Sequence, residues 1–182
     1  MPTYMIKELT YGLRDYYRHA DETEQIILNA ALTAAAADAV GGMIPGLAIP
    51  ATIISCFGAV WAMYGSLCSK LGISLKEHTL KLLAKAALAN ITANLGGVLV
   101  AMFAGMFVPG AAILVSAAVS FIAVYLAGVV FLRLILSMAQ KSSDPYTFSD
   151  ISASEMKKEA RNVTVSTDDL KAAKTSYEKN KA

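Results

Sequence analysis

The longest uncharged run of this chain has a proline at its centre. Lys85 and Arg133 bound the run, and Pro109 divides it into two flanks of 23 residues each. An α-helix rises about 1.5 Å per residue, so each flank is long enough to cross the hydrocarbon core of a bilayer, which is about 30 Å thick. Proline and glycine interrupt helices. The sequence therefore predicts a membrane helical hairpin with Pro109 and Gly110 at its tip.

A second Pro-Gly pair occurs earlier in the chain. Pro45 and Gly46 interrupt another apolar region, and the two regions align without a gap at an offset of 64 residues, which places Pro45 on Pro109 and Gly46 on Gly110. Aromatic positions in the second arms also coincide. We interpret the two regions as a duplicated hairpin; the alternative is two hairpins that converged on the same turn chemistry.

The predicted fold class is therefore all-α: an integral membrane protein of two Pro-Gly-tipped helical hairpins with an amphipathic N-terminal helix and a polar helical C-terminal tail. The N-terminal helix, residues 1–20, combines helically spaced apolar residues with lysine, arginine and tyrosine. This is typical of a membrane interface, and contact with a partner domain is the alternative. Residues 21–138 form the membrane domain, with hairpins at 22–69 and 75–138, and residues 139–182 form the polar tail.

Two helix starts are recognisable in the tail. Ser152 precedes Glu155 by three residues, and Ser166 precedes Asp169 by three residues. This spacing is typical of a capping box, in which two side chains satisfy the first backbone amides of a helix. The helices that follow carry few apolar residues. We expect a tail that is solvated and mobile, or that folds on a cytoplasmic protein partner.

The composition and the positions of the charges favour a membrane environment. The chain is 55% hydrophobic and 16% charged, whereas soluble proteins average about 25% charged residues. The net charge of +2 is too small to indicate nucleic acid as a partner. Lysines lie between the two uncharged runs at 70–85, and Arg133 follows the second of these runs. Because such residues stay in the cytoplasm, we expect a bacterial inner-membrane protein in contact with the lipid bilayer, with both termini cytoplasmic.

The number of membrane crossings depends on the two hairpin tips, which carry no charge. Either the tips emerge on the far side, or they stop inside the bilayer with their polar backbone covered by protein. The sequence leaves four, two or no full crossings open.

Small residues recur at every fourth position in the apolar segments. Gly97, Ala101 and Gly105 follow this spacing in one arm, and Ser116 and Ser120 follow it in another. Such a stripe allows two helix backbones to approach closely. Packing within the chain is one use of these stripes, but their number favours a homo-oligomer.

No catalytic, cofactor or metal site is predicted. The sequence has no phosphate-binding glycine loop, no recognisable Ser-His-acid constellation, and no second ligand at metal spacing for either histidine. We therefore predict that the protein is not an enzyme. Asp38 is the one acid inside an otherwise apolar region. It is either an intramembrane polar site or an aspartate at the membrane surface, beyond the end of a true span.

An ordered series of short motifs runs through Ala34–Leu136, a little over half of the chain. The motifs are Ile44-Pro45, Ile49-Pro50, Met63-Tyr64-Gly65, Leu71-Gly72-Ile73-Ser74-Leu75, Leu80–Leu83 and Val108-Pro109-Gly110. In this order they resemble the membrane domain of unknown function that accompanies Era-like GTPases (the YcjF type). The resemblance implies a domain that lies beside or behind a GTPase. This chain has no GTPase of its own, so a nucleotide-linked role would need a separate protein.

Two functions are consistent with these patterns. The first is a non-enzymatic, membrane-embedded scaffold or accessory protein that self-assembles, works with a separate GTPase and binds a cytoplasmic partner through its tail. The alternative is a pore-forming or channel protein whose hairpins insert into the membrane. In that case Asp38, Asn29 and Thr33 would line a polar path together with Asn90 and Asn94.

Overall fold

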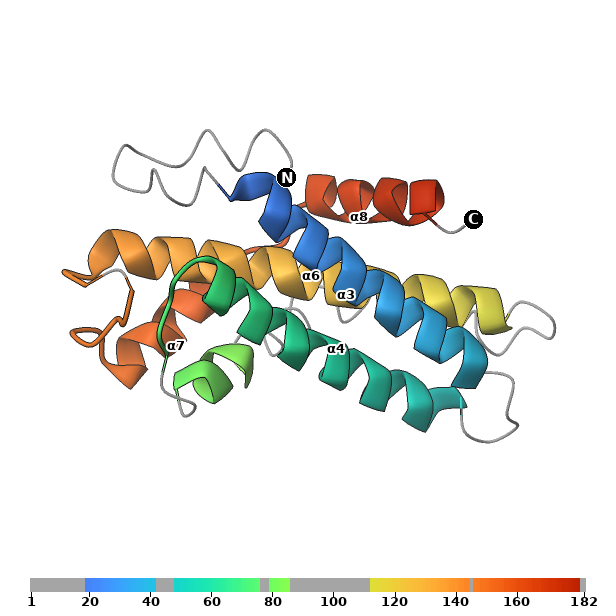
Figure 1. The fold of residues 1–182 in the computed structure, drawn as a ribbon, viewed down its shortest axis with the longest axis horizontal. Coiled ribbons are helices and arrows are strands. Elements are labelled where there is room, and N and C mark those ends of the chain that lie inside the picture. The colour runs from blue at the N-terminus through green and yellow to red at the C-terminus, as the bar shows by residue number, and fades with distance from the viewer. Residues whose placement is uncertain (1–18, 42–47, 76–78, 86–111, 145, 181–182) are drawn as a thin grey trace.

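The computed structural model describes residues 19–41, 48–75, 79–85, 112–144 and 146–180, and every regular element within them is a helix (Figure 1). The named helices are α3 (Ala20–Gly41), α4 (Ala48–Lys70), α6 (Ala112–Lys141), α7 (Ala153–Asn162) and α8 (Thr167–Asn180). Residues 79–85 are helical as well. The predicted all-α class is confirmed for these parts of the chain. Residues 1–18 of the predicted N-terminal helix lie outside them.

Helix α6 forms the centre of the structure. Figure 1 shows α3 crossing it obliquely, and both α3 and α4 pack against it. The sequence explains this position, because the 21 residues from Ala112 to Leu132 carry no charge. From Ala117 onward most α6 side chains are buried, and Phe121, Leu126 and Phe131 are fully so. The longest apolar helix is therefore surrounded by the others.

Helices α3 and α4 run in opposite directions, and α4 and α6 run in the same direction (Figure 1). The ring of Tyr64 on α4 stacks on Phe131 of α6, with 3.8 Å between ring centroids and 9° between ring planes. The Tyr64 hydroxyl donates to the carbonyl oxygen of Ala127 at 3.2 Å, across 63 positions. This separation is close to the 64-residue offset of the inferred duplication. The duplication stays a prediction, because both hairpin tips lie outside the described residues.

Helix α3 approaches α6 closely at Gly128. A Cβ atom on Gly128 would lie 2.6 Å from Cγ1 of Ile27 on α3 and 2.9 Å from Sδ of Met63 on α4. Ala31 and Ala34 of α3 are also buried. Small side chains thus allow three helices to meet without a gap at this point.

Helix α4 ends in a Schellman motif. The amide of Ile73 donates to the carbonyl oxygen of Cys68 at 2.8 Å, and Gly72 has a φ of +68°. Glycine adopts this left-handed conformation without a steric penalty. The amide of Ser74 then donates to the carbonyl oxygen of Tyr146 at 2.9 Å. The end of α4 is thereby attached to the loop that follows α6.

The tail differs from the predicted solvated and mobile arm, because α7 and α8 both pack against α6. Met156 and Ala160 on α7 and Ala173 on α8 are buried. The apolar residues of the tail are few, but they are spaced three or four positions apart, as Leu170, Ala173 and Tyr177 are. This spacing gathers them on one helix face that can cover α6.

One stretch among the described residues, Ala117–Lys141 in α6, is long and apolar enough to cross a membrane. Most of it is buried inside the protein. The core helix of a water-soluble protein has the same length and composition, so this stretch alone does not establish a membrane fold. The two-hairpin membrane arrangement and the domain boundaries stay predictions.

Candidate functional site

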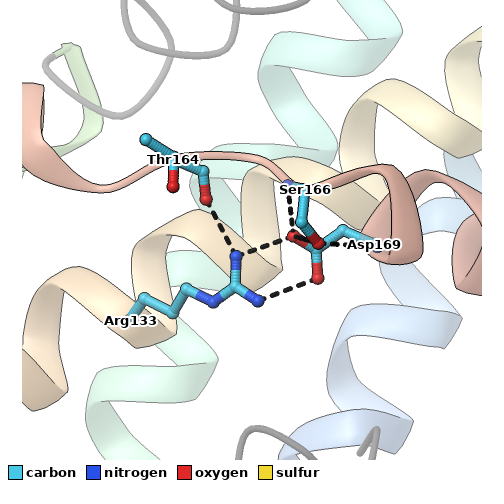
Figure 2. A network of polar contacts seen from close by, with 4 residues as sticks. All are labelled: Arg133, Thr164, Ser166 and Asp169. Atoms are coloured by element: carbon cyan, nitrogen blue, oxygen red, sulfur yellow. Dashed lines mark hydrogen bonds and ion pairs between the residues drawn. The ribbon is translucent and has the colours of Figure 1, made fainter.

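A polar network around Arg133 joins the core helix to the tail (Figure 2). Two guanidinium nitrogens of Arg133 donate to the two carboxylate oxygens of Asp169, at 2.7 and 2.8 Å. One of these nitrogens also donates to the carbonyl oxygen of Thr164 at 2.9 Å. The planar guanidinium matches a carboxylate in this two-point geometry. One side chain of α6 therefore holds both the α7–α8 connection and the first turn of α8.

The carboxylate of Asp169 is inaccessible to solvent, whereas the Arg133 side chain is 19% exposed. Asp169 also accepts hydrogen bonds from the amide and the hydroxyl of Ser166, at 2.8 and 2.9 Å, and its own amide donates to that hydroxyl at 3.1 Å. This is the capping box predicted at the start of α8, and it is confirmed. A buried carboxylate that loses its cation is strongly unfavourable, so the position of α8 depends on Arg133.

A second buried polar contact lies between α3 and α6. The Ser120 hydroxyl donates to the Asp38 carboxylate at 2.8 Å, and both residues are fully buried. Asp38 therefore lies inside the protein and not at its surface. Both the intramembrane site and the position at the membrane surface stay predictions for Asp38.

Helix α7 is attached to the end of α6 by contacts of its own. Glu159 accepts hydrogen bonds from the Lys141 ammonium and from the Ser137 hydroxyl. These two hydrogen bonds, from Lys141 first and Ser137 second, lower the pKa of the Glu159 carboxyl. Glu159 is therefore charged at neutral pH, and α7 and α8 are held on α6 by separate polar groups. The predicted capping box of Ser152 at the start of α7 is also confirmed.

The outward face of α4 has no charge before Lys70. Phe57 is 58% exposed and Trp61 is 41% exposed, and Gly65 has open space beside its Cα atom. A shallow groove on this face is lined by Ile26 of α3 and by Ala62, Gly65, Ser66, Ser69 and Lys70. Surface helices of soluble proteins usually direct charged residues outward. This face instead suits an apolar or interfacial environment.

Most of the predicted site residues fall outside the part of the chain that the structure describes. They are the hairpin-tip and stripe residues Pro45, Gly46, Gly97, Ala101, Gly105, Pro109 and Gly110. Ser116 lies in α6, but its side chain is not among those that the structure describes. The structure brings together the remaining two, Asp38 and Ser120, which the sequence assigns to different roles.

The Arg133 network is not among the sequence predictions. In the sequence, Arg133 ends an apolar run and Asp169 completes a capping box. Neither pattern predicts that these two residues contact each other. The apolar spacing of Leu170, Ala173 and Tyr177 is the signal that could have linked them. It indicates that α8 packs against another helix, and Arg133 is one of the two charged residues of the covered helix, the other being Lys141 at its end.

The polar contacts at Asp38, Arg133 and Glu159 all join one helix to another. Within the described residues, no group of three or more His, Cys, Asp or Glu side chains could hold a metal ion. No protein-family model matches the chain, and neither the curated proteins nor the solved structures give a match.

Proposed function

We propose that this protein is a non-enzymatic, membrane-embedded scaffold or accessory protein of the bacterial inner membrane. The observation that carries the proposal is the outward face of α4, which exposes Phe57 and Trp61 and has no charge before Lys70. Exposure of such a face to water is unfavourable. Lipid acyl chains suit Phe57, and the membrane interface suits the amphipathic ring of Trp61.

The dimensions of α6 support the same environment. Its uncharged part, Ala112–Leu132, has 21 residues, which corresponds to about 30 Å of helix and to the thickness of the hydrocarbon core. Arg133 follows at once and would lie at the cytoplasmic side. The two predicted hairpins would then place the basic segment 70–85 and the tail on that same side.

Self-assembly and a GTPase partner belong to the proposal as well. Gly58 and Gly65 on the outward face of α4 have open space beside them, so a helix of a second copy could approach closely there. The resemblance to the YcjF type suggests a separate GTPase as the cytoplasmic partner. The exposed side of α8, which includes Lys171 and Lys174, is the surface that we assign to this partner.

Membrane extraction and fluorescence test the proposal. The expressed protein should stay in the membrane pellet after an alkaline carbonate wash and dissolve in detergent. Trp61 is the single tryptophan, so its emission should shift to shorter wavelength when the purified protein meets lipid vesicles. Phe57→Lys should reduce the shift, whereas Gln25→Lys on the polar side of α3 should not. The proposal would be contradicted if the protein stayed soluble and its Trp61 emission did not change when vesicles were added.

Partner binding is tested with the tail in place, because its removal would uncover α6. Charge reversal of Lys171 and Lys174 should reduce recovery of the cytoplasmic partner in pull-down experiments, and detergent-solubilised protein should run as an oligomer. Undiminished recovery would show that the exposed side of α8 does not bind the partner.

A pore-forming protein is the second candidate, and one observation favours it. The most apolar described helix, α6, is largely covered by other parts of the chain, as expected for a segment that is protected until it meets a membrane. Conductance across planar bilayers tests this function. The current should change with Asp38→Ala if Asp38 lines the path, and the absence of any current from reconstituted protein would exclude a pore.

A further inference from the structure

Helix α8 lies along the part of α6 that would occupy the hydrocarbon core. Near the start of α8, Asp169 contacts Arg133. Near its end, the ring of Tyr177 packs on Phe121, with 5.3 Å between ring centroids. The contacts on α6 therefore extend from position 133 back to position 121, which is about 18 Å of helix.

The outer side of α8 is charged and exposed. The side chains of Lys171 and Asp168 are 74% and 71% exposed, and Lys174, Glu178 and Lys179 are exposed as well. Each charged side chain is strongly unfavourable in the middle of a bilayer. Helix α8 therefore cannot accompany α6 into the hydrocarbon core while it lies along positions 121–133.

We propose that α8 is a detachable cover, and that α6 enters a bilayer only after α8 leaves it. This inference rests on the proposed membrane function and adds a conformational step to it. The structure describes the covered state, in which Phe121 contacts Tyr177. In the inserted state, lipid acyl chains take the place of α8 against this surface of α6.

The polar contacts divide the tail into a part that stays and a part that leaves. Glu159 holds α7 to Lys141, which lies beyond the uncharged part of α6 and outside the hydrocarbon core. Arg133 holds α8 through Asp169 and the connection through Thr164. Loss of the Arg133 contacts therefore leaves α8 held on α6 by apolar packing, such as the Tyr177–Phe121 contact, and favours its release, while α7 stays attached to the end of α6.

A covalent replacement for the Arg133–Asp169 ion pair tests the inference. In the full chain carrying Cys56→Ser and Cys68→Ala, the changes Arg133→Cys and Asp169→Cys remove the ion pair and supply two thiols. A short bismaleimide then joins these thiols. The same protein is thus obtained in a released form and in a locked form, which separates an effect of α8 from a general effect on folding.

The reporter is a tryptophan placed beneath α8. The variant carries Phe121→Trp and Trp61→Phe, so that its tryptophan is at position 121. Its fluorescence is measured in vesicles of equal parts phosphatidylcholine and phosphatidylglycerol. The acyl chains of these lipids carry bromine, which quenches tryptophan on contact. Cross-linking should lower the quenched fraction by about tenfold or more, because the link removes the released state from the population. In the uncross-linked protein with Arg133 and Asp169 intact, Glu159→Gln loosens α7 alone and should leave the quenching unchanged.

Two outcomes would contradict the inference: one rejects only the release of α8, and the other rejects the proposed membrane function as well. Equal quenching in the locked and released forms would overturn the inference alone, since α6 would then enter the bilayer with α8 attached. No quenching in either form, together with unchanged Trp61 emission of the unmodified protein in vesicles, would reject the proposed membrane function and the inference with it.

Discussion

Ser120 on α6 donates a hydrogen bond of 2.8 Å to the carboxylate of Asp38 on α3, and neither residue is exposed to solvent. A polar group buried between apolar helices is stable only when its hydrogen bonds are made. The close contact of Ile27 with Gly128 lies 11 positions earlier on α3, about 16 Å along the helix. These two contacts together fix how α3 lies on α6.

Ser120→Ala should lower the free energy of unfolding by about 1–3 kcal/mol, because the buried carboxylate of Asp38 loses a donor. Asp38→Ala combined with Ser120→Ala should cost less than the sum of the two single changes, since the two groups interact directly. Urea unfolding followed by circular dichroism, in buffer or mild detergent, measures these values. Ser66→Ala, on the exposed side of α4, is the control and should change stability by less than about 0.5 kcal/mol. Fully additive costs would contradict a direct interaction.

Local patterns in the sequence were sufficient to predict several features that the structure confirms. The capping boxes of Ser152 and Ser166 involve residues three positions apart, so their spacing alone identifies them. The helical character of α3, α4 and α6 follows in the same way from long apolar segments between breakers. Asp38 could be selected as the one acid of an apolar region, and Ser120 as a member of a stripe of small residues.

The pairing of distant residues could not be predicted from the same patterns. Asp38 and Ser120 are 82 positions apart, and Arg133 and Asp169 are 36 positions apart. Which residues meet depends on how the helices cross, and helix crossing is set by small contacts such as the one at Gly128. The polar composition of the tail also concealed its packing, because a few apolar residues at helical spacing are enough to cover one side of α6.

Gly128→Ala should destabilise the protein by about 1–3 kcal/mol, because the added methyl group would overlap Ile27 and Met63. Gly65→Ala is the matched control on α4. Nothing lies within 4 Å of a Cβ atom at Gly65, so this change should be neutral or should stabilise the helix by about 0.5–1 kcal/mol. Thermal unfolding of the two variants side by side measures the difference. If Gly128→Ala were as stable as Gly65→Ala, α3 would not pack on α6 at this point.

Arg133→Ala should cost about 3–5 kcal/mol, because it leaves the buried carboxylate of Asp169 without its cation. Lys171→Ala removes an ion pair of the same helix whose partners are largely exposed, and such pairs contribute only about 0–1 kcal/mol. Arg133→Lys should fall between the two, because lysine keeps the charge but not the two-point geometry. Chemical unfolding gives the three values, and amide hydrogen exchange in α8 shows whether the loss is local. Equal costs for Arg133→Ala and Lys171→Ala would contradict the role of Arg133 in holding α8.

The loop between α6 and α7 should respond to acid through Asp150. Hydrogen bonds from the Ser142 hydroxyl, and then from the amide and hydroxyl of Ser143, lower the pKa of the Asp150 carboxyl to about 2 from an ordinary value of 3.8. Because the pKa is lower in the folded state than in the unfolded state, the carboxylate stabilises the folded loop at every pH above about 4. This contribution declines as the pH falls from about 4 towards 2, and nothing should change near neutral pH.

The amide of Ser143 is a direct reporter of this titration, since it donates to a carboxylate oxygen of Asp150 at 2.7 Å. Its chemical shift in nitrogen-15 NMR spectra should move with a midpoint near pH 2, and Asp150→Asn should abolish the transition. The amide of Ser152, which donates to Glu155 at 2.9 Å, provides an internal comparison, because hydrogen bonds from Ser152 lower the pKa of Glu155 as well. A midpoint for Ser143 at the ordinary aspartate value would show that the serine hydrogen bonds do not persist in solution.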